Sequence, residues 1–272
     1  MSHSEASFRR ARRRRGVYGL GQWVKIISIV ATAFGILWTA YTYVVESDVR
    51  SFEQRQKAWA MLNEHAREER CLADEHLASV PHYHTNSGQI DAIEFLVKQR
   101  TSLSGVGLPC SEFGQLRASH GSFSNAGFWW SNFTLAEFDY ADLTLTDLDH
   151  STLDNASFAG AKMTGARLHG VIAPEVDFTG ADLTGLRASG SDFRGAVFKN
   201  AILKDTILNR ARLTDADFTD AKFQNVSFTD ACYVPHPKNA DGSQGKPIAW
   251  PANIGDLKVC PPDWNVQLDD ID

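Results

Sequence analysis

Residues 121–230 decide the fold, because this stretch divides without a gap into units of five: GSFSN AGFWW SNFTL AEFDY ADLTL TDLDH STLDN ASFAG AKMTG ARLHG VIAPE VDFTG ADLTG LRASG SDFRG AVFKN AILKD TILNR ARLTD ADFTD AKFQN VSFTD. The third residue is Phe, Leu or Met in 20 of the 22 units, the exceptions being Ala173 and Ala188, and the first residue is most often Ala. Neither an α-helix nor a flat strand has this period. One large and one small apolar residue per unit predicts a solenoid whose units bury them by stacking.

Units such as ADLTG, ADFTD and ARLTD resemble those of the pentapeptide-repeat superfamily. The resemblance implies an all-β solenoid, a right-handed quadrilateral β-helix with one pentapeptide per side and twenty residues per coil. Residues twenty apart then stack on one side, and one such column is entirely Phe. We predict that this column is the structural core: Phe138, Phe158, Phe178, Phe198 and Phe218. The same phase continues backward through residues 101–120, where it predicts a degenerate first coil.

Before the repeat, residues 26–45 contain no charged side chain. Twenty helical residues at about 1.5 Å each match a hydrocarbon core of about 30 Å, which predicts a transmembrane helix. Trp23 at one end and Tyr41 and Tyr43 at the other suit the two membrane interfaces. A cleaved signal peptide is the rival interpretation, although its apolar region is normally shorter and ends at a small-residue cleavage site.

Basic residues predict the orientation of this span. Seven of the 27 Lys and Arg residues lie in the first 25 residues, with Glu5 as the only acid there. Because Lys and Arg flanking a span tend to stay in the cytoplasm, the N-terminus is expected inside and the repeat outside. We therefore expect a single-pass protein of a bacterial inner membrane with a periplasmic repeat domain. The basic run is read as a topology determinant or an anionic-lipid contact rather than a nucleic-acid patch.

All four cysteines follow the span, where this orientation predicts an oxidising compartment. Their spacing favours two local disulfides, Cys71 with Cys110 and Cys232 with Cys260, one near each end of the repeat. Four cysteines allow three pairings, so the connectivity is a hypothesis.

Both ends of an open solenoid need covers, because they expose unpaired backbone and core. Helical stripes in 51–72 and 89–100 predict an N-terminal cap; they comprise Phe52, Trp59, Leu62 and Ala66, and Ile90, Ile93, Leu96 and Val97. These helices are also expected to cover apolar residues at outward or corner positions of the first coil, namely Trp129, Trp130, Leu135, Tyr140 and Leu145. The proline-rich C-terminal segment predicts an irregular cap. The expected domains are a basic segment (1–25), the span (26–45), membrane-proximal helices and cap (46–120), the repeat (121–230) and the C-terminal cap (231–272).

Motifs of enzymes are missing from the sequence, which has no Walker loop, GxSxG, HExxH or CxxC. We therefore expect no catalytic activity and no cofactor. His82 and His84, two apart in one segment, are weak candidates for a metal site, and a solvated histidine-rich loop is the simpler interpretation. His150 and His169, near Asp147, Asp149 and Asp154, are expected on the outside of a convex rod without a cleft.

The function expected from these features is a non-catalytic, membrane-anchored scaffold that docks a protein partner and no nucleic acid. Residues 121–160 contain no Lys or Arg, so we expect a one-signed patch that selects a basic partner, formed by Glu137, Asp139, Asp142, Asp147, Asp149 and Asp154. The resemblance offers an alternative, since some superfamily members mimic duplex DNA and act on type II topoisomerases. A metal- or ligand-binding envelope protein is a further alternative.

Overall fold

The computed structural model describes residues 32, 34–63, 88–234, 247–250 and 257–261. The chain divides into two compact units, Met1–Gln56 and Lys57–Asp272. The described residues of the first unit are helical, with Trp38 and Tyr41 exposed. Across the described ranges no helix combines the length and the apolar character needed to cross a membrane. Of the span predicted at 26–45, residues 26–31 and 33 lie outside these ranges.

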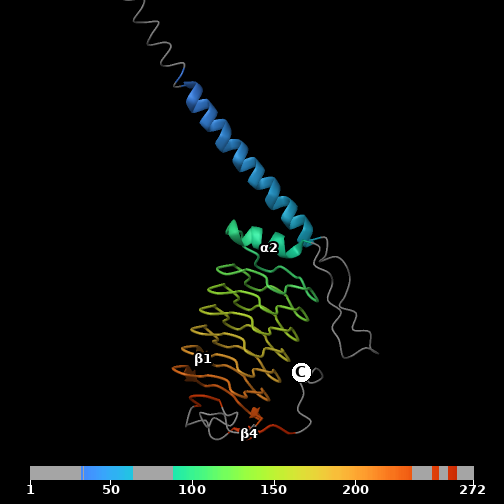
Figure 1. Ribbon diagram of the computed structural model, residues 1–272, viewed down its shortest axis with the longest axis vertical. Coiled ribbons are helices and arrows are strands. Elements are labelled where there is room, and N and C mark those ends of the chain that lie inside the picture. Colours follow the sequence, from blue (N-terminus) through green and yellow to red (C-terminus); the bar gives the residue numbers. More distant parts are fainter. Residues whose placement is uncertain (1–31, 33, 64–87, 235–246, 251–256, 262–272) are drawn as a thin grey trace, which may run out of the picture. The chain divides into compact units, whose positions relative to one another are not determined.

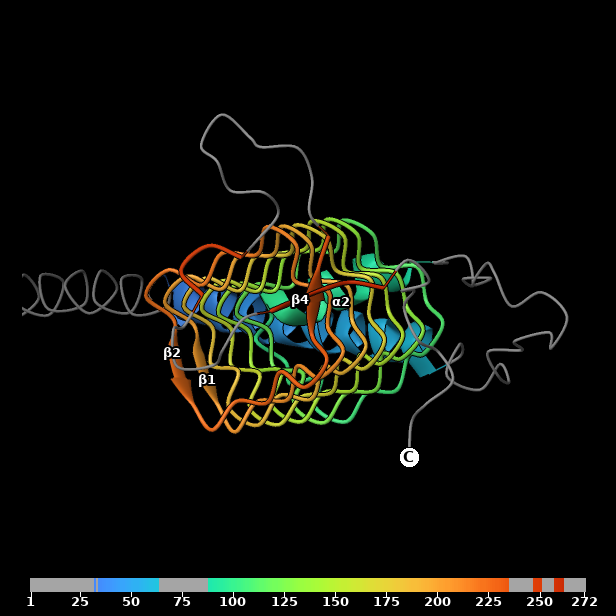
Figure 2. The same ribbon diagram turned by 90° about the horizontal axis from the view of Figure 1, so that it is seen from below.

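In the second unit, coils of twenty residues stack beneath helix α2 (Gln89–Lys98), as Figure 1 shows. From Gly107 to Arg212, the second residue of each unit pairs in parallel with the residue twenty positions later, as in Ser122↔Asp142. Each coil makes four such pairings, one per side, and the coils lie over one another when seen from below (Figure 2). The predicted solenoid is therefore confirmed, while its hand stays a prediction. The pairings begin with Gly107↔Gly127, so residues 101–120 form a coil in the structure.

Three backbone hydrogen bonds per unit join neighbouring coils. In the unit that begins at Gly121, Phe123 N–H donates to Asp142 O at 2.7 Å and Asn125 N–H to Thr144 O at 2.8 Å. A third bond runs in the opposite direction, from Asp142 N–H to Gly121 O at 2.9 Å. The bend within each unit limits the extended part of a side to about three residues, so most sides pair through a single bridge. Among the described residues the regular strands are β1 (Ile202–Lys204), β2 (Lys222–Gln224), β3 (Cys232–Tyr233) and β4 (Lys258–Val259).

The fifth residue of every unit from 105 to 230 has a positive φ, which makes it the corner of the coil. This left-handed conformation strains side chains with a Cβ, and Gly, Asn and Asp tolerate it best. Many corners accordingly carry these residues, for example Gly160, Asn200 and Asp220. Other corners hold large side chains in the same conformation, such as Tyr140 with φ 56°.

Asp or Asn at the second position satisfies a backbone donor in its own unit. Thr144 donates its N–H to Asp142 Oδ1 at 3.1 Å and its hydroxyl to the same oxygen at 2.6 Å. Asp182 with Thr184 and Asp217 with Thr219 repeat this arrangement. The hydroxyl bond is the main reason why the pKa of Asp142 lies below its ordinary value, with Lys162 of the next coil adding to it. Asp142 is thus a structural part of the turn as well as a surface charge.

Third-position side chains fill the interior. The predicted Phe column is fully buried, with ring centroids 5.3 Å apart between Phe138 and Phe158 and 4.7 Å apart between Phe198 and Phe218. A second aromatic feature lies across it: all four sides of the coil 121–140 have Phe at the centre, and these rings meet at centroid distances of 5.4–5.9 Å. We call these residues the Phe layer: Phe123, Phe128, Phe133 and Phe138. The core is therefore most aromatic near its N-terminal end.

Helical residues cover the first coil. Leu62 and, from α2, Ile93 and Leu96 are buried in the same hydrophobic cluster as the coil interiors. Glu94 of α2 also accepts the Arg117 N–H at 3.0 Å, replacing the carbonyl that a preceding coil would supply. These contacts join the helical residues to the start of the solenoid. Phe52, in the first unit, is 55% exposed, and Ala66 lies outside the described residues.

At the other end a returning segment completes the final coil. Ile248 pairs with Asp217, and Phe218 N–H donates to Ile248 O at 3.0 Å. Trp250 lies against Phe218 and Phe228 at centroid distances of 5.8 and 4.8 Å, so it covers the last rings of the core.

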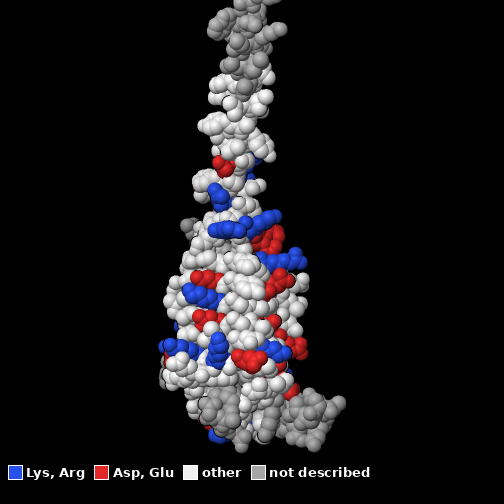
Figure 3. Space-filling view, turned by 90° about the vertical axis from the view of Figure 1, so that its left-hand side faces the viewer, with Lys and Arg blue, Asp and Glu red and all other residues white. Residues whose placement is uncertain are grey.

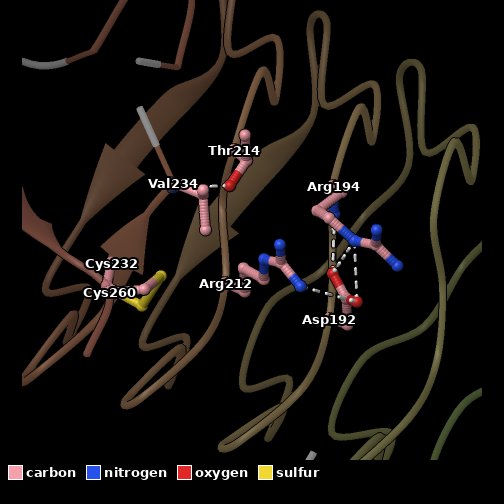
Figure 4. The surroundings of a disulfide bond; sticks show 7 residues. All are labelled: Asp192, Arg194, Arg212, Thr214, Cys232, Val234 and Cys260. Atoms are coloured by element: carbon pink, nitrogen blue, oxygen red, sulfur yellow. Dashed lines mark hydrogen bonds and ion pairs between the residues drawn. A yellow bond between two sulfur atoms is a disulfide. The ribbon is translucent and has the colours of Figure 1, made fainter. Parts of the chain in front are cut away.

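A disulfide fastens this C-terminal cap. Cys232 in β3 is bonded to Cys260, directly after β4 (Figure 4). Nearby on the side of the solenoid, Asp192 is buried, and its Oδ1 and Oδ2 accept the Arg194 Nε–H at 2.9 and 2.8 Å, respectively. Cys110 is disulfide-bonded as well, and its predicted partner Cys71 lies outside the described residues.

Candidate interaction surface

Four large apolar side chains are exposed at or next to the corners of neighbouring coils. Their exposed fractions are 38% for Trp129, 52% for Leu135, 65% for Tyr140 and 55% for Leu145. Leu135, Tyr140 and Leu145 are corner residues, and Trp129 directly precedes the corner residue Trp130. Because consecutive units occupy consecutive sides, the four side chains lie at or next to four successive corners and together encircle the solenoid. We call them the apolar girdle. The prediction that helices cover these residues is wrong for the girdle within the described part of the chain, because the helices pack on the end of the core and the four side chains stay exposed.

Two members of the girdle lie over corner glycines of the next coil. Tyr140 lies over Gly160, where an added Cβ would be 2.5 Å from Tyr140 Cε1. Leu145 lies over Gly165 in the same way, with the corresponding Cβ 2.8 Å from Leu145 Cδ2. His120, one coil earlier, stacks on the other side of Tyr140 with ring centroids 5.3 Å apart and planes 9° from parallel. Tyr140 is therefore held between a ring and a glycine although it faces solvent.

Beside the girdle, on the side that contains Trp129, lies a buried carboxylate. Asp149 is 4% exposed, accepts the His169 N–H at 2.8 Å and forms a close ion pair with Arg167. Asp147 lies 3.8 Å from the same guanidinium. We call these residues, with His150, the Asp149 cluster. Arg167 joins two carboxylates of the preceding coil, so the cluster ties adjacent coils together.

Two histidines of the cluster are partly enclosed. His150 stacks on Trp130 with ring centroids 4.5 Å apart, and its Nδ1 is buried with no hydrogen-bond partner among the described residues. Burial lowers the pKa of His150 and that of His169 below their ordinary value, outweighing the opposing effect of Asp149. Burial also raises the pKa of Asp147. These directions favour neutral imidazoles in the folded protein.

The predicted one-signed patch is not formed. Its six acids fall on all four sides of the coil, because the four units that carry them occupy successive sides. Arg167 pairs with two of them, and Lys162 stacks beside Asp142. Figure 3 shows the result on one face, where basic and acidic side chains alternate along the solenoid. The surface charge is therefore mixed, with unpaired acids scattered around the girdle.

No metal site is found in the part of the chain that the structure describes, since no three His, Cys, Asp or Glu side chains there are grouped to hold an ion. The candidates His82 and His84 lie outside this part. The sequence indicates that His150 and His169 lie near Asp147 and Asp149, but it does not point to Arg167, which pairs with the buried Asp149. A comparison of residues 18 and 20 positions apart would have found Arg167 and His169 beside Asp149.

The repeat region matches a known family. The family model described as pentapeptide repeats matches residues 131–170, 141–180, 161–200, 177–215 and 191–230, with eight copies. Residues 131–230 are therefore pentapeptide repeats, as their resemblance predicted. A search of curated proteins found no match.

Solved structures similar to this chain include other pentapeptide-repeat proteins. QnrB1, a plasmid-mediated fluoroquinolone resistance protein, is 15% identical over 48% of this chain and 76% of its own, with a TM-score of 0.30. Rfr23 from the cyanobacterium Cyanothece is 16% identical over 47% of this chain and 83% of its own, with a TM-score of 0.28. A protein from the Arabidopsis thaliana thylakoid lumen is 20% identical over 60% of this chain and 82% of its own, with a TM-score of 0.22.

Proposed function

We propose that this chain is a non-catalytic interaction module whose pentapeptide-repeat solenoid presents the apolar girdle to a protein partner. The observation that carries this proposal is the exposure of Trp129, Leu135, Tyr140 and Leu145 on a well-packed support. Exposed aromatic and aliphatic side chains rimmed by polar residues are typical of protein interfaces. Gly160 on one side and His120 on the other hold the Tyr140 ring, which reduces the entropy that this side chain would lose on binding.

The partner is a protein with an apolar contact surface and a basic rim. Residues 101–160 contain seven acids and one base, whereas residues 161–234 contain nine of each. Glu137 and Asp154, on sides adjacent to the Leu135 corner, have no ion-pair partner among the described residues. These two carboxylates favour a basic group on the partner near Leu135, within a surface that is otherwise of mixed charge.

The proposal includes a membrane anchor at residues 26–45, with the N-terminus in the cytoplasm and the solenoid in the periplasm of a bacterium. The uncharged stretch and the seven preceding bases support this topology. The Cys232–Cys260 disulfide supports it as well, because such bonds persist in oxidising compartments.

DNA mimicry directed at a type II topoisomerase has less support. A mimic of duplex DNA needs a continuous negative surface, and residues 161–234 have equal numbers of acids and bases. The ion pairs of Arg167 and Arg194 further reduce the negative potential of the later coils. A C-terminal reporter fusion that is active only in the cytosol would reverse this ranking.

The interface is tested by photo-crosslinking the full-length protein in its native membrane. A photoreactive residue at position 140 should crosslink a partner, and one at position 200 should not. Asn200 is a matched control, because it occupies the same corner three coils later with nearly the same φ, 57° against 56°. Leu145→Ser should weaken crosslinking from position 140. Equal crosslinking from both positions would show that the girdle is not the contact surface.

A further inference from the structure

A basic hollow lies between the C-terminal end of α2 and the first two coils. Its volume is about 520 Å³, and its polar lining comprises Lys98, Arg100, Thr101, His120 and Ser122. Lys98 comes from the helix, Arg100 and Thr101 from the chain that enters the first coil, and the other two from the following corner and side. The lining contains no Asp or Glu.

The two strongest bases of the hollow are not used by the fold. Lys98 and Arg100 are exposed, and the ion pairs within the described residues involve neither of them. Bases at a helix C-terminus often cap the last carbonyls, but backbone donors do so here. Gln99, Arg100 and Thr101 donate their N–H groups to the carbonyls of Phe95, Val97 and Leu96 at 2.8–3.0 Å. Both side-chain cations are thus available to a ligand.

The remaining groups are held in position around these cations. The His120 imidazole is fixed by its stack on Tyr140 and can add an N–H donor. Thr101 and Ser122 add hydroxyls. The carboxylate below Ser122 in the same column, Asp142, accepts two hydrogen bonds from Thr144 and is therefore directed along its own coil. The hollow accordingly offers several donors and no competing acid in its wall.

We propose that this hollow binds a phosphate group. A planar guanidinium beside an ammonium and hydroxyl donors matches the charge and the several acceptor oxygens of phosphate. The group can come from free phosphate or from the headgroup of an anionic phospholipid. The lipid source rests on the membrane anchor proposed above, whereas the phosphate site does not.

The test uses the full-length protein in detergent micelles, with inorganic phosphate as the first probe and isothermal calorimetry as the measurement. Dissolved short-chain phosphatidylglycerol is the second probe, and acetate at equal ionic strength is the comparison anion. Lys98→Gln with Arg100→Gln should weaken phosphate binding by about tenfold or more, since charge-assisted hydrogen bonds are lost. Arg117→Gln is the matched control, because it removes one exposed base of the first coil outside the hollow.

Phosphate binding that is lost in the double variant and kept in Arg117→Gln supports the site. Binding of phosphatidylglycerol without binding of inorganic phosphate, with the same dependence on the variants, supports the site and assigns its source to lipid. Three results would overturn the proposal: no binding of either probe, acetate binding as tight as phosphate binding, or equal losses in the double variant and in Arg117→Gln. Because Lys98 and Arg100 are exposed, the variants should keep the circular dichroism spectrum of the parent.

Discussion

Tyr140 lies across Gly160 so closely that a Cβ added to the glycine would be 2.5 Å from the Tyr140 ring. Gly180, the next residue of the same corner, has a similar φ, 68° against 64°, but no atom within 4 Å of an added Cβ. Replacing Gly180 therefore tests only the backbone conformation of the corner, whereas replacing Gly160 also tests the support of the Tyr140 ring.

Both Gly160→Ala and Gly180→Ala should lower the free energy of unfolding by about 1 kcal/mol, the cost of a Cβ in the left-handed conformation. Only Gly160→Ala should displace Tyr140 and disturb its stack on His120. Thermal unfolding measures the first effect, and the NMR chemical shifts of the Tyr140 ring measure the second. Equal ring shifts in both variants would contradict the close contact.

Phe178 lies in the middle of the Phe column, stacked between Phe158 and Phe198. Phe178→Ala should cost about 3–5 kcal/mol, because it removes a buried ring and leaves a cavity between rigid coils. Phe223→Ala, at a half-buried position near the end, should cost clearly less. Chemical denaturation of both variants checks the order, and a reversed order would mean that the column is not the stable part of the core.

Acidification below about pH 6.5 should destabilise the solenoid. Burial lowers the pKa of His150 and of His169 from the ordinary value of 6.5, so below that pH the unfolded chain binds protons that the folded chain does not. The contribution of these two neutral imidazoles to the free energy of unfolding is complete above about pH 6.5, and it is lost as the pH falls through their lowered pKa values.

Asp147 changes the stability in the opposite direction on acidification, because its pKa is raised from 3.8, but this effect falls at lower pH. Asp149, Arg167 and Arg187 also interact electrostatically with His169. His150→Phe combined with His169→Gln should therefore flatten the dependence of the melting temperature on pH. An unchanged slope in this double variant would exclude the two histidines as its source.

Reduction of the Cys232–Cys260 disulfide should loosen the C-terminal cap. The bond closes a segment of 28 residues, for which the chain-entropy model gives about 3–4 kcal/mol. Cys232→Ala with Cys260→Ala should lower stability by up to that amount and expose Trp250, which now contacts Phe218 and Phe228. A red shift of tryptophan fluorescence before global unfolding would report the opening. Identical unfolding curves for the parent and the variant would contradict this role.

Much of the fold follows from the sequence. The period of five predicts the units, and the twenty-residue coil predicts that Phe138 and Phe158 stack, which they do. The amphipathic pattern around Ile93 and Leu96 correctly indicates the cap. These predictions succeed because each depends on one repeated apolar position, whose burial leaves few alternatives.

The surface could not be predicted in the same way. Asp147 and Asp149 read as repulsive neighbours along the chain, but their environment is decided by Arg167 on the next coil. Apolar residues such as Tyr140 suggest a cover, whereas the corner geometry keeps them exposed. Charges and corners depend on pairing with residues about twenty positions away, and this pairing is known only when the sides of the coil are assigned.

The returning segment that pairs Ile248 with Asp217 also restricts how the length of this protein can change. An insertion of twenty residues adds one full turn, so every later side keeps its orientation and the cap still meets its partner. An insertion of five residues rotates all that follows by about a quarter turn, which moves the attachment point of the cap to another side. Gain and loss of sequence within the solenoid are therefore expected in whole turns.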